Sequence, residues 1–268
     1  MPVDSIKLSS AATGEFWEIP VLYEDPHLLA LDKPAGLLTS PDRYDPNRPN
    51  LMKLLHAAIA EQKPWAAQRG LSYLSIAHRL DFETSGVIVL AKSKEILTGL
   101  ANLFGSELVK KKYVALVQGA PQSDTFEVDA RLAPHPAMPH IVRIDRRRGK
   151  KSRTAFSVID KFRDWTLLRC EPFPGRTHQI RAHLRSVRLP IVADLLYGGQ
   201  PLRLSRIKPG YRSKQSESER PLMSRLALHA EELSLEHPAT RQPITIQSPW
   251  PKDFEVTLKY LRRYALSS

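Results

Sequence analysis

Cysteine is almost absent from this 268-residue chain, and long apolar runs are missing altogether. Because Cys170 is the only cysteine, the chain can form no internal disulfide and no cluster of thiolate metal ligands. In its apolar, strand-like surroundings, Cys170 is predicted to be a small core residue. No apolar run approaches the roughly 20 residues of a membrane-spanning helix, and MPVDSIKLSS at the N-terminus lacks the basic and apolar segments of a secretion signal. We therefore expect a cytoplasmic protein.

Acidic residues are scarce relative to basic ones. The chain has 28 Asp and Glu against 40 Lys and Arg, which gives a formal net charge of +12. Basic patches attract nucleic acids electrostatically, so this charge predicts a polyanionic partner, with a membrane surface as the weaker option. A hydrophobic content of 42% is enough to fill a core, and the length suits one large or two small domains.

The sequence contains no repeat, heptad pattern or low-complexity tract, and its elements are predicted from local patterns. Apolar runs bounded by turn residues predict strands at 19–23, 28–31, 110–119, 126–132, 154–162, 165–170 and 227–235. Asn50 and Ser93 are predicted to cap two helices. The second helix is expected to bury one stripe, formed by Leu97, Leu100, Ala101, Phe104 and Leu108. Residues 1–18 are expected to form an N-terminal arm, and the polar stretch at about 200–224 a flexible insert.

The segment HRLDFETSG, residues 78–86, places an acid directly before the apolar run 87–91. One interpretation is that Asp81 and Thr84 form a turn, because such side chains bond to the backbone at strand ends. The other is that Asp81 carries chemistry, which would require a second, basic site elsewhere in the chain. His78 is predicted to be structural.

The segment PGRTHQIRAHLRSVRLP, residues 174–190, provides such a site. Thr177 is predicted to cap a helix with an apolar face and a cationic face beside it. The apolar positions are Ile180, Leu184 and Val187, and the cationic ones are Arg181, Arg185 and Arg188. Because cations at a helix N-terminus oppose the helix dipole, Arg176, His178 and Arg181 call for an acidic or phosphate partner. His178 and His183 lack an HExxH pattern, so no metal site is expected.

A third basic segment runs from Arg143 to Arg153 and contains seven Arg or Lys and one Asp. It is either a solvated hairpin loop or a contact surface for phosphates, and the sequence favours neither.

Four motifs, HRLDFETSG, KKKYVALVQG, PGRTHQIRAHL and RLALHAEEL, occur in this order after DKPAGLLTS. Together they resemble the RluA-type RNA pseudouridine synthases, from about residue 20 to the C-terminus. The resemblance implies an α+β catalytic domain over 19–268, with a mixed, mostly antiparallel sheet in two halves, flanking helices and a central basic cleft. Members often carry an N-terminal S4-type RNA-binding module, for which residues 1–18 would be too short.

The resemblance also implies roles for individual residues. Asp81 would be the catalytic aspartate, Tyr113 the active-site tyrosine and Arg181 the basic partner. Leu228 matches the apolar position that packs near the target base. Isomerising uridine to pseudouridine needs no cofactor, but it needs an ionised carboxylate, which either attacks covalently or removes a sugar proton. Arg181 would keep Asp81 charged in a dry cleft.

A uridine stacked in RNA must be flipped out to reach such a site. Arg79 could stack in the vacated space, or it could form an ion pair with Glu83. Further RNA contacts are predicted for Arg176, His178, Lys111 and Arg147. We expect a monomer that binds ribosomal or transfer RNA. Two alternatives remain: a noncatalytic RNA-binding protein on the same scaffold, and an RNA N-glycosidase with Glu83 as its second acid.

Overall fold

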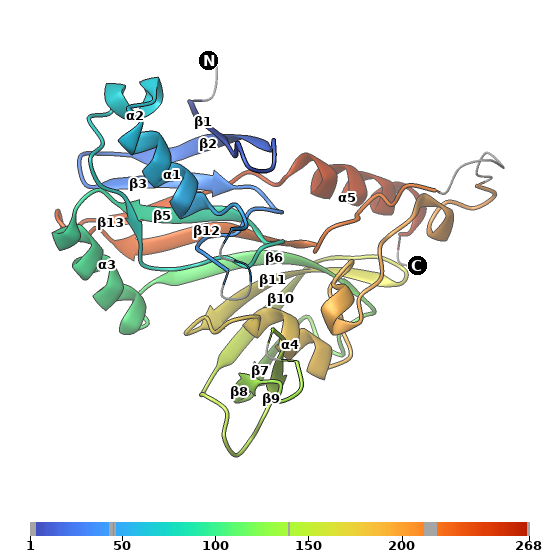
Figure 1. Cartoon of the computed structure of the whole chain (residues 1–268). Helices are drawn as coiled ribbons and strands as arrows, with labels where there is room; N and C mark the ends of the chain where they lie inside the picture. Colours follow the sequence, from blue (N-terminus) through green and yellow to red (C-terminus); the bar gives the residue numbers. More distant parts are fainter. Residues whose placement is uncertain (1–3, 43–44, 46, 139, 212–218, 267–268) are drawn as a thin grey trace. The chain divides into compact units, whose positions relative to one another are not determined.

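The computed structural model describes residues 4–42, 45, 47–138, 140–211 and 219–266 (Figure 1). Its class is α+β, as predicted, and the strand pairs within each part run antiparallel. The chain forms two compact units. Unit 1 comprises 1–111 and 230–249, and unit 2 comprises 112–229 and 250–268. The prediction of one catalytic domain over 19–268 stays a prediction, and 212–218 of the predicted insert lie outside the described residues.

The strands of unit 1 pair in the order β1 (Ser5–Ser9), β2 (Phe16–Glu24), β3 (Leu28–Lys33) and β5 (Ser85–Ala91). Three more belong to it: β4 (Ser75–Ile76) on β5, β13 (Pro243–Gln247), and most of β12 (Leu228–Glu236), which pairs with β13. The stretch expected to be an arm therefore contributes β1, in which Ile6 is opposite Ile19 of β2. Both residues are fully buried.

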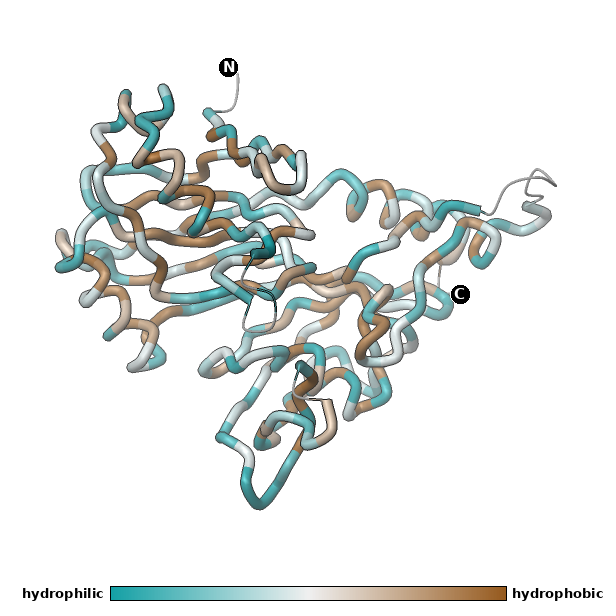
Figure 2. The backbone as a smooth tube through the Cα atoms, viewed as in Figure 1, coloured by the Kyte–Doolittle hydropathy of each residue, from teal (hydrophilic) through white to brown (hydrophobic). Residues whose placement is uncertain are grey.

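Helices cover both faces of this sheet, which explains why all seven residues of β5 are buried. Ile88 and Leu90 pack in one apolar cluster with α1 (Leu51–Ala60), whereas Val87 and Val89 pack in another with α3 (Lys94–Gly105). Side chains on a strand alternate between its faces, so one continuous apolar run fills two layers. Figure 2 shows β5 as one of the most hydrophobic segments. A short helix, α2 (Pro64–Gln68), follows α1.

The predicted helix starts are confirmed. The Asn50 side chain accepts a hydrogen bond from Lys53 N at 2.9 Å, and that of Ser93 accepts one from Ile96 N at 3.2 Å. The buried stripe of α3 was predicted wrongly in part. It consists of Ile96, Leu100 and Leu103, whereas Leu108 is 66% exposed because the helix ends at Gly105.

Unit 2 has a sheet in the order β6 (Lys110–Gln118, which starts in unit 1), β11 (Trp165–Phe173), β10 (Arg153–Lys161) and β7 (Thr125–Asp129). A second, two-stranded sheet consists of β8 (Leu132–Pro134) and β9 (Val142–Ile144). The predicted strand 126–132 is thus two strands, since the chain turns from one sheet to the other near Ala130. Cys170 is buried in the core of this unit, as predicted.

The helices of unit 2 are α4 (Gln179–Ser186) and α5 (Lys252–Tyr264), with short 3₁₀ turns η1 (Leu195–Tyr197) and η2 (Leu204–Arg206). Both α4 and α5 bury apolar side chains in the core that β6 and β11 line. Among the residues that the structure describes, no helix is long and apolar enough to cross a membrane.

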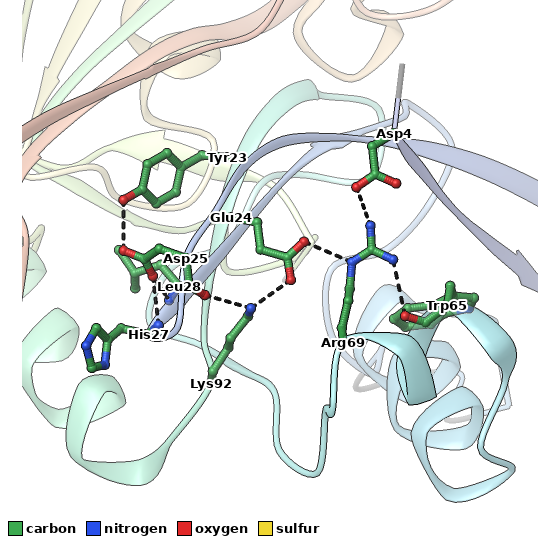
Figure 3. A network of polar contacts seen from close by, with 9 residues as sticks. All are labelled: Asp4, Tyr23, Glu24, Asp25, His27, Leu28, Trp65, Arg69 and Lys92. Atoms are coloured by element: carbon green, nitrogen blue, oxygen red, sulfur yellow. Dashed lines mark hydrogen bonds and ion pairs between the residues drawn. The ribbon is translucent and has the colours of Figure 1, made fainter. Parts of the chain in front are cut away.

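A polar network ties the β2–β3 turn of unit 1 to its surroundings (Figure 3). Asp25 accepts hydrogen bonds from the backbone N–H groups of His27 and Leu28, both at 2.7 Å, and from the Tyr23 hydroxyl at 2.8 Å. Lys92 donates to the carbonyl of Asp25 and to Glu24, and Glu24 also accepts from Arg69. These contacts join the turn to Lys92, which follows β5, and to Arg69, which follows α2.

Candidate active site

The loop that carries Asp81 forms a turn directly before β5 in unit 1. The Asp81 carbonyl accepts a hydrogen bond from Thr84 N at 3.2 Å, and the strand begins at Ser85. The turn interpretation is therefore right for the backbone, and it leaves a chemical role of the carboxyl group open. The Thr84 hydroxyl is buried and has no hydrogen-bond partner among the described residues.

Both backbone neighbours of Asp81 are held by the loop that follows β3, which carries the DKPAGLLTS motif. The Thr39 hydroxyl donates to Leu80 O at 2.9 Å and accepts from Leu80 N at 3.2 Å. On the other side, Phe82 O accepts from Gly36 N at 2.9 Å. Asp81 thus lies between two peptide groups whose positions are fixed by a segment about forty residues earlier in the chain.

Lys33 organises this loop from inside. Its side chain is fully buried, and its ammonium group donates to Leu37 O at 2.7 Å, to Pro34 O at 2.8 Å and, more weakly, to Phe82 O at 3.5 Å. A buried charge is tolerated only when its hydrogen bonds are satisfied, so the loop must close around the ammonium group. The sequence interpretation missed Lys33 and Thr39, since a lysine at a strand end and a threonine in a loop are common on solvated surfaces.

Gly86 is required by the close approach of β12 to the start of β5. Its φ is +116°, and a Cβ atom built there would lie 2.2 Å from Ala230 O. Any larger residue would push the two backbones apart and move the turn that carries Asp81.

His78 has a structural role, in agreement with its prediction. Its Nε2 accepts a hydrogen bond from Val89 N at 3.0 Å, and its ring stacks on Phe104 with the centroids 4.6 Å apart. Burial, and secondarily the charge of Lys111, lowers the pKa of His78 to about 3. The ring is therefore neutral at pH 7.

Arg79 is exposed beside this turn. An ion pair between Arg79 and Glu83 stays a prediction. Stacking in the space of a flipped base stays a prediction.

In unit 2, α4 buries Arg181 in a two-pronged ion pair. Arg181 Nε donates to Asp194 Oδ2 and its second nitrogen to Asp194 Oδ1, both at 2.8 Å, and the two side chains are 3% and 0% exposed. The acidic partner expected for this helix end therefore includes Asp194, a residue that the sequence interpretation did not name. The signal available was an acid inside the apolar run IVADLLY.

The start of α4 differs from its prediction. The residue before the helix is His178, with a left-handed φ of 51°, and Thr177 makes no capping bond. Instead Gln179 Oε1 accepts from the backbone N–H groups of Arg176 and Gly175, at 2.7 and 3.3 Å. Thr177 fails as a cap because the chain enters the helix one residue later. Val187, predicted to be on the apolar face, is 40% exposed, since α4 ends at Ser186.

The other predicted site residues are distributed over both units. Tyr113 is half-buried on β6, opposite Cys170 of β11, and Leu228 is buried at the start of β12. Lys111, at the unit 1 end of β6, has its pKa lowered by burial, and its ammonium group lies 5.9 Å from the centre of the Phe104 ring. Arg176 is exposed.

The basic run 143–153 forms the end of a hairpin and the start of β10. All seven of its cations are exposed, including Arg147. Asp145 organises the turn by accepting from the backbone N–H groups of Arg148 and Arg147 at 2.9 and 3.0 Å, and these bonds lower the pKa of Asp145. Its backbone turn is therefore fixed while the charges project into solvent. Phosphate contact stays a prediction.

One other cluster resembles an acid–base site, but its hydrogen bonds exclude that role. His237 Nε2 bonds to Asp25 Oδ2 at 2.8 Å. However, its Nδ1 accepts from the backbone N–H groups of Thr240 and Ala239, at 3.0 and 3.2 Å, so that nitrogen cannot accept a proton from a nucleophile. No group of three or more potential metal ligands is found among the described residues.

Asp81 therefore belongs to unit 1, whereas Tyr113, Arg181 and Leu228 belong to unit 2. The pairing of Asp81 with Arg181 and the central basic cleft stay predictions.

Comparison with known proteins matches residues 27–186 to the family model of RNA pseudouridylate synthases. A ribosomal large subunit pseudouridine synthase D from Nitrosomonas europaea is 37% identical over 93% of this chain and 67% of its own. A ribosomal large subunit pseudouridine synthase C from Vibrio vulnificus is 34% identical over 90% of this chain and 70% of its own.

Among solved structures, human RNA pseudouridylate synthase domain containing 4 matches with a TM-score of 0.66 and 24% identity, over 90% of this chain and 92% of that one. That likeness shows a shared fold. The family match spans both the Asp81 turn and the Arg181 helix, so the predicted resemblance is confirmed, and the chain belongs to the RNA pseudouridylate synthase family.

Proposed function

We propose that this enzyme isomerises a specific uridine of ribosomal RNA to pseudouridine, with Asp81 as the catalytic carboxylate. The observation that carries the proposal is the attachment of both neighbours of Asp81: Thr39 holds Leu80, and Gly36 holds Phe82. Catalysis by a positioned group depends on geometry, and a displacement of about 1 Å can cost about 100-fold in rate. The choice of ribosomal RNA rests on the relatives, which are named for the large ribosomal subunit.

The reaction breaks the bond between C1′ of ribose and N1 of uracil, and rejoins the base through C5. In this proposal Asp81 either attacks covalently or removes a sugar proton, and both routes require its ionised form. Arg181 favours that form by its charge, and Asp194 orients Arg181 through two hydrogen bonds. Tyr113 offers an aromatic face to the uracil and a hydroxyl group near its C5 proton.

RNA binding is assigned to exposed cations. The run 143–153 and Arg176 in unit 2 would contact phosphates, and Arg79 would stack where the flipped uridine was. The residues that bind thus differ from those that react.

The decisive experiment replaces Asp81 by Asn, which keeps the shape and removes the charge. Purified Asp81→Asn protein is expected to bind RNA and to form no pseudouridine on large-subunit ribosomal RNA, as measured by nucleoside analysis and by mapping modified positions. Glu95→Gln, a change of an exposed acid on α3, is the matched control and should retain activity. Appreciable turnover by Asp81→Asn would remove Asp81 from the mechanism.

The same product analysis tests the alternatives. A glycosidase releases free uracil, whereas a synthase yields an isomer of unchanged mass. A noncatalytic binding protein leaves the uridines of the bound RNA unaltered.

A further inference from the structure

A hairpin in unit 2 carries most of the basic run and packs against the helix that contains Arg181. We define the basic arm as residues 130–152, which include β8, β9 and the turn at 145–149. Its two ends are closed by backbone bonds, from Ala130 N to Ser152 O at 3.0 Å and between Leu132 and Lys150 in both directions, at 2.8 and 2.9 Å. Its small apolar cluster, separate from the main core of the unit, unites Leu132 with Ala182 of α4 and Tyr197 of η1.

The backbone N–H and C=O groups of Val142 on β9 face away from β8. His135 N donates to Ile141 O at 2.8 Å, so His135 and Ile141 form a hydrogen-bonded pair. Bonded and non-bonded pairs alternate along an antiparallel ladder, and the next pair, Pro134 with Val142, is therefore non-bonded. At this point β9 is an edge whose N–H and C=O groups need partners from outside the arm.

One side chain supplies both partners. The Tyr197 hydroxyl accepts from Val142 N at 2.8 Å and donates to Val142 O at 3.1 Å, and it also lies 3.0 Å from His178 Nδ1. The face of the same ring lies under the guanidinium group of Arg181, whose central carbon is 5.0 Å from the ring centre. Tyr197 is 5% exposed, so these contacts are made in a largely dry environment.

We propose that Tyr197 is a positioning residue that joins the two tasks of unit 2: its hydroxyl holds the basic arm against α4, and its ring holds Arg181. The inference rests on the proposed function for the identity of the ligand, RNA, and of the reaction. RNA binding should therefore depend on the Tyr197 hydroxyl, through the basic arm, and catalysis on the Tyr197 ring, through Arg181.

Tyr197→Phe tests the hydroxyl, because it keeps the ring and removes the bonds to Val142. Amide hydrogen exchange in the peptide 140–146 of the free protein should become about tenfold faster, since one hydrogen bond of ordinary strength corresponds to about a factor of ten. KM for ribosomal RNA should rise by about the same factor, while kcat at saturating RNA stays within about twofold of the parent value.

Tyr197→Leu removes the ring as well, so kcat should also fall by about tenfold or more. Tyr264→Phe is the matched control. The Tyr264 ring also lies near a cation, Arg263, at 5.2 Å, but its hydroxyl has no hydrogen bond among the described residues. It should change neither exchange nor kinetics.

Unchanged amide exchange at 140–146 in Tyr197→Phe would show that the Tyr197 hydroxyl does not hold the basic arm. Faster exchange with unchanged KM would overturn the assignment of RNA binding to the arm. If the parent protein formed no pseudouridine, the proposed function would fail. Amide exchange, and the affinity for a single-stranded RNA of mixed sequence, would still decide whether the Tyr197 hydroxyl holds the basic arm and whether the arm binds RNA.

Discussion

Asp194 and Asp253 each hold an arginine by two hydrogen bonds, but in different surroundings. The Arg181–Asp194 pair is 3% and 0% exposed, whereas Arg225 and Asp253 are 20% and 39% exposed. A single charge left behind in a buried pair is far more costly than one that water can reach. The two pairs therefore allow a comparison at the scale of one residue.

Asp194→Asn is expected to lower the free energy of unfolding by about 3–5 kcal/mol, because Arg181 would stay buried after losing its charged hydrogen bonds to Asp194. The matched change Asp253→Asn should cost about 1 kcal/mol or less. Urea unfolding of both variants measures the difference. Equal costs would mean that water reaches Arg181 far more easily than its 3% exposure indicates.

A second prediction at this scale concerns Thr39. Thr39→Val keeps the shape and removes both hydrogen bonds to Leu80, so kcat should fall by about 10- to 100-fold through displacement of Asp81. Thr39→Ser restores the hydroxyl and should restore most of kcat. If Val and Ser behave alike in single-turnover measurements, the hydroxyl does not position the acid.

At the scale of the element, the basic run 143–153 combines a backbone turn held by hydrogen bonds with exposed positive charge. The backbone turn is held by Asp145, while the side chains of Arg146, Arg147, Arg148 and Lys150 are exposed. A rigid turn presents cations at low entropic cost, which suits contact with phosphates.

Replacing these four cations by Gln should weaken the binding of target and unrelated RNA alike, because phosphate contacts carry no sequence information. Each lost contact should remove roughly 0.7 to 0.9 from the slope of log affinity against log salt. The slope is measured by titration at several salt concentrations, and kcat at saturating RNA should not change. An unaltered slope would leave the turn as a solvated hairpin.

For the whole molecule, buried histidines predict that stability falls in mild acid. The pKa of His78 is lowered to about 3, mainly by burial, and burial also lowers the pKa of His183. An unfolded histidine binds a proton near its usual pKa of about 6.5, so the unfolded state gains protons first as pH falls. The contribution of these histidines to the unfolding free energy is therefore complete above about pH 6.5, and it is lost as the pH falls from there towards the pKa of the folded state.

His78→Asn should remove one part of this dependence. Between pH 7.5 and pH 5.0, the parent protein should lose about 2 kcal/mol more unfolding free energy than the variant, as one buried neutral histidine implies. Urea unfolding at the two pH values gives the comparison. Parallel losses in the two proteins would show that His78 is protonated in the folded state.

Local signals in the sequence determined much of this protein. The caps Asn50 and Ser93 depend on residues three positions apart, and strands such as β5 show as apolar runs, so both were predictable. The four motifs likewise identified the family, and the comparisons confirm it.

Only the tertiary structure decided which side chains hold the site. Thr39 meets Leu80 from 41 residues away, Arg181 meets Asp194 from 13, and Tyr197 meets Val142 from 55. Such bonds leave no spacing in the sequence, because the partners are brought together by the packing of whole elements. The exposed end of α3 and the shifted start of α4 were misjudged for the same reason: periodicity gives the faces of a helix, but the chain around it decides where the helix begins and ends.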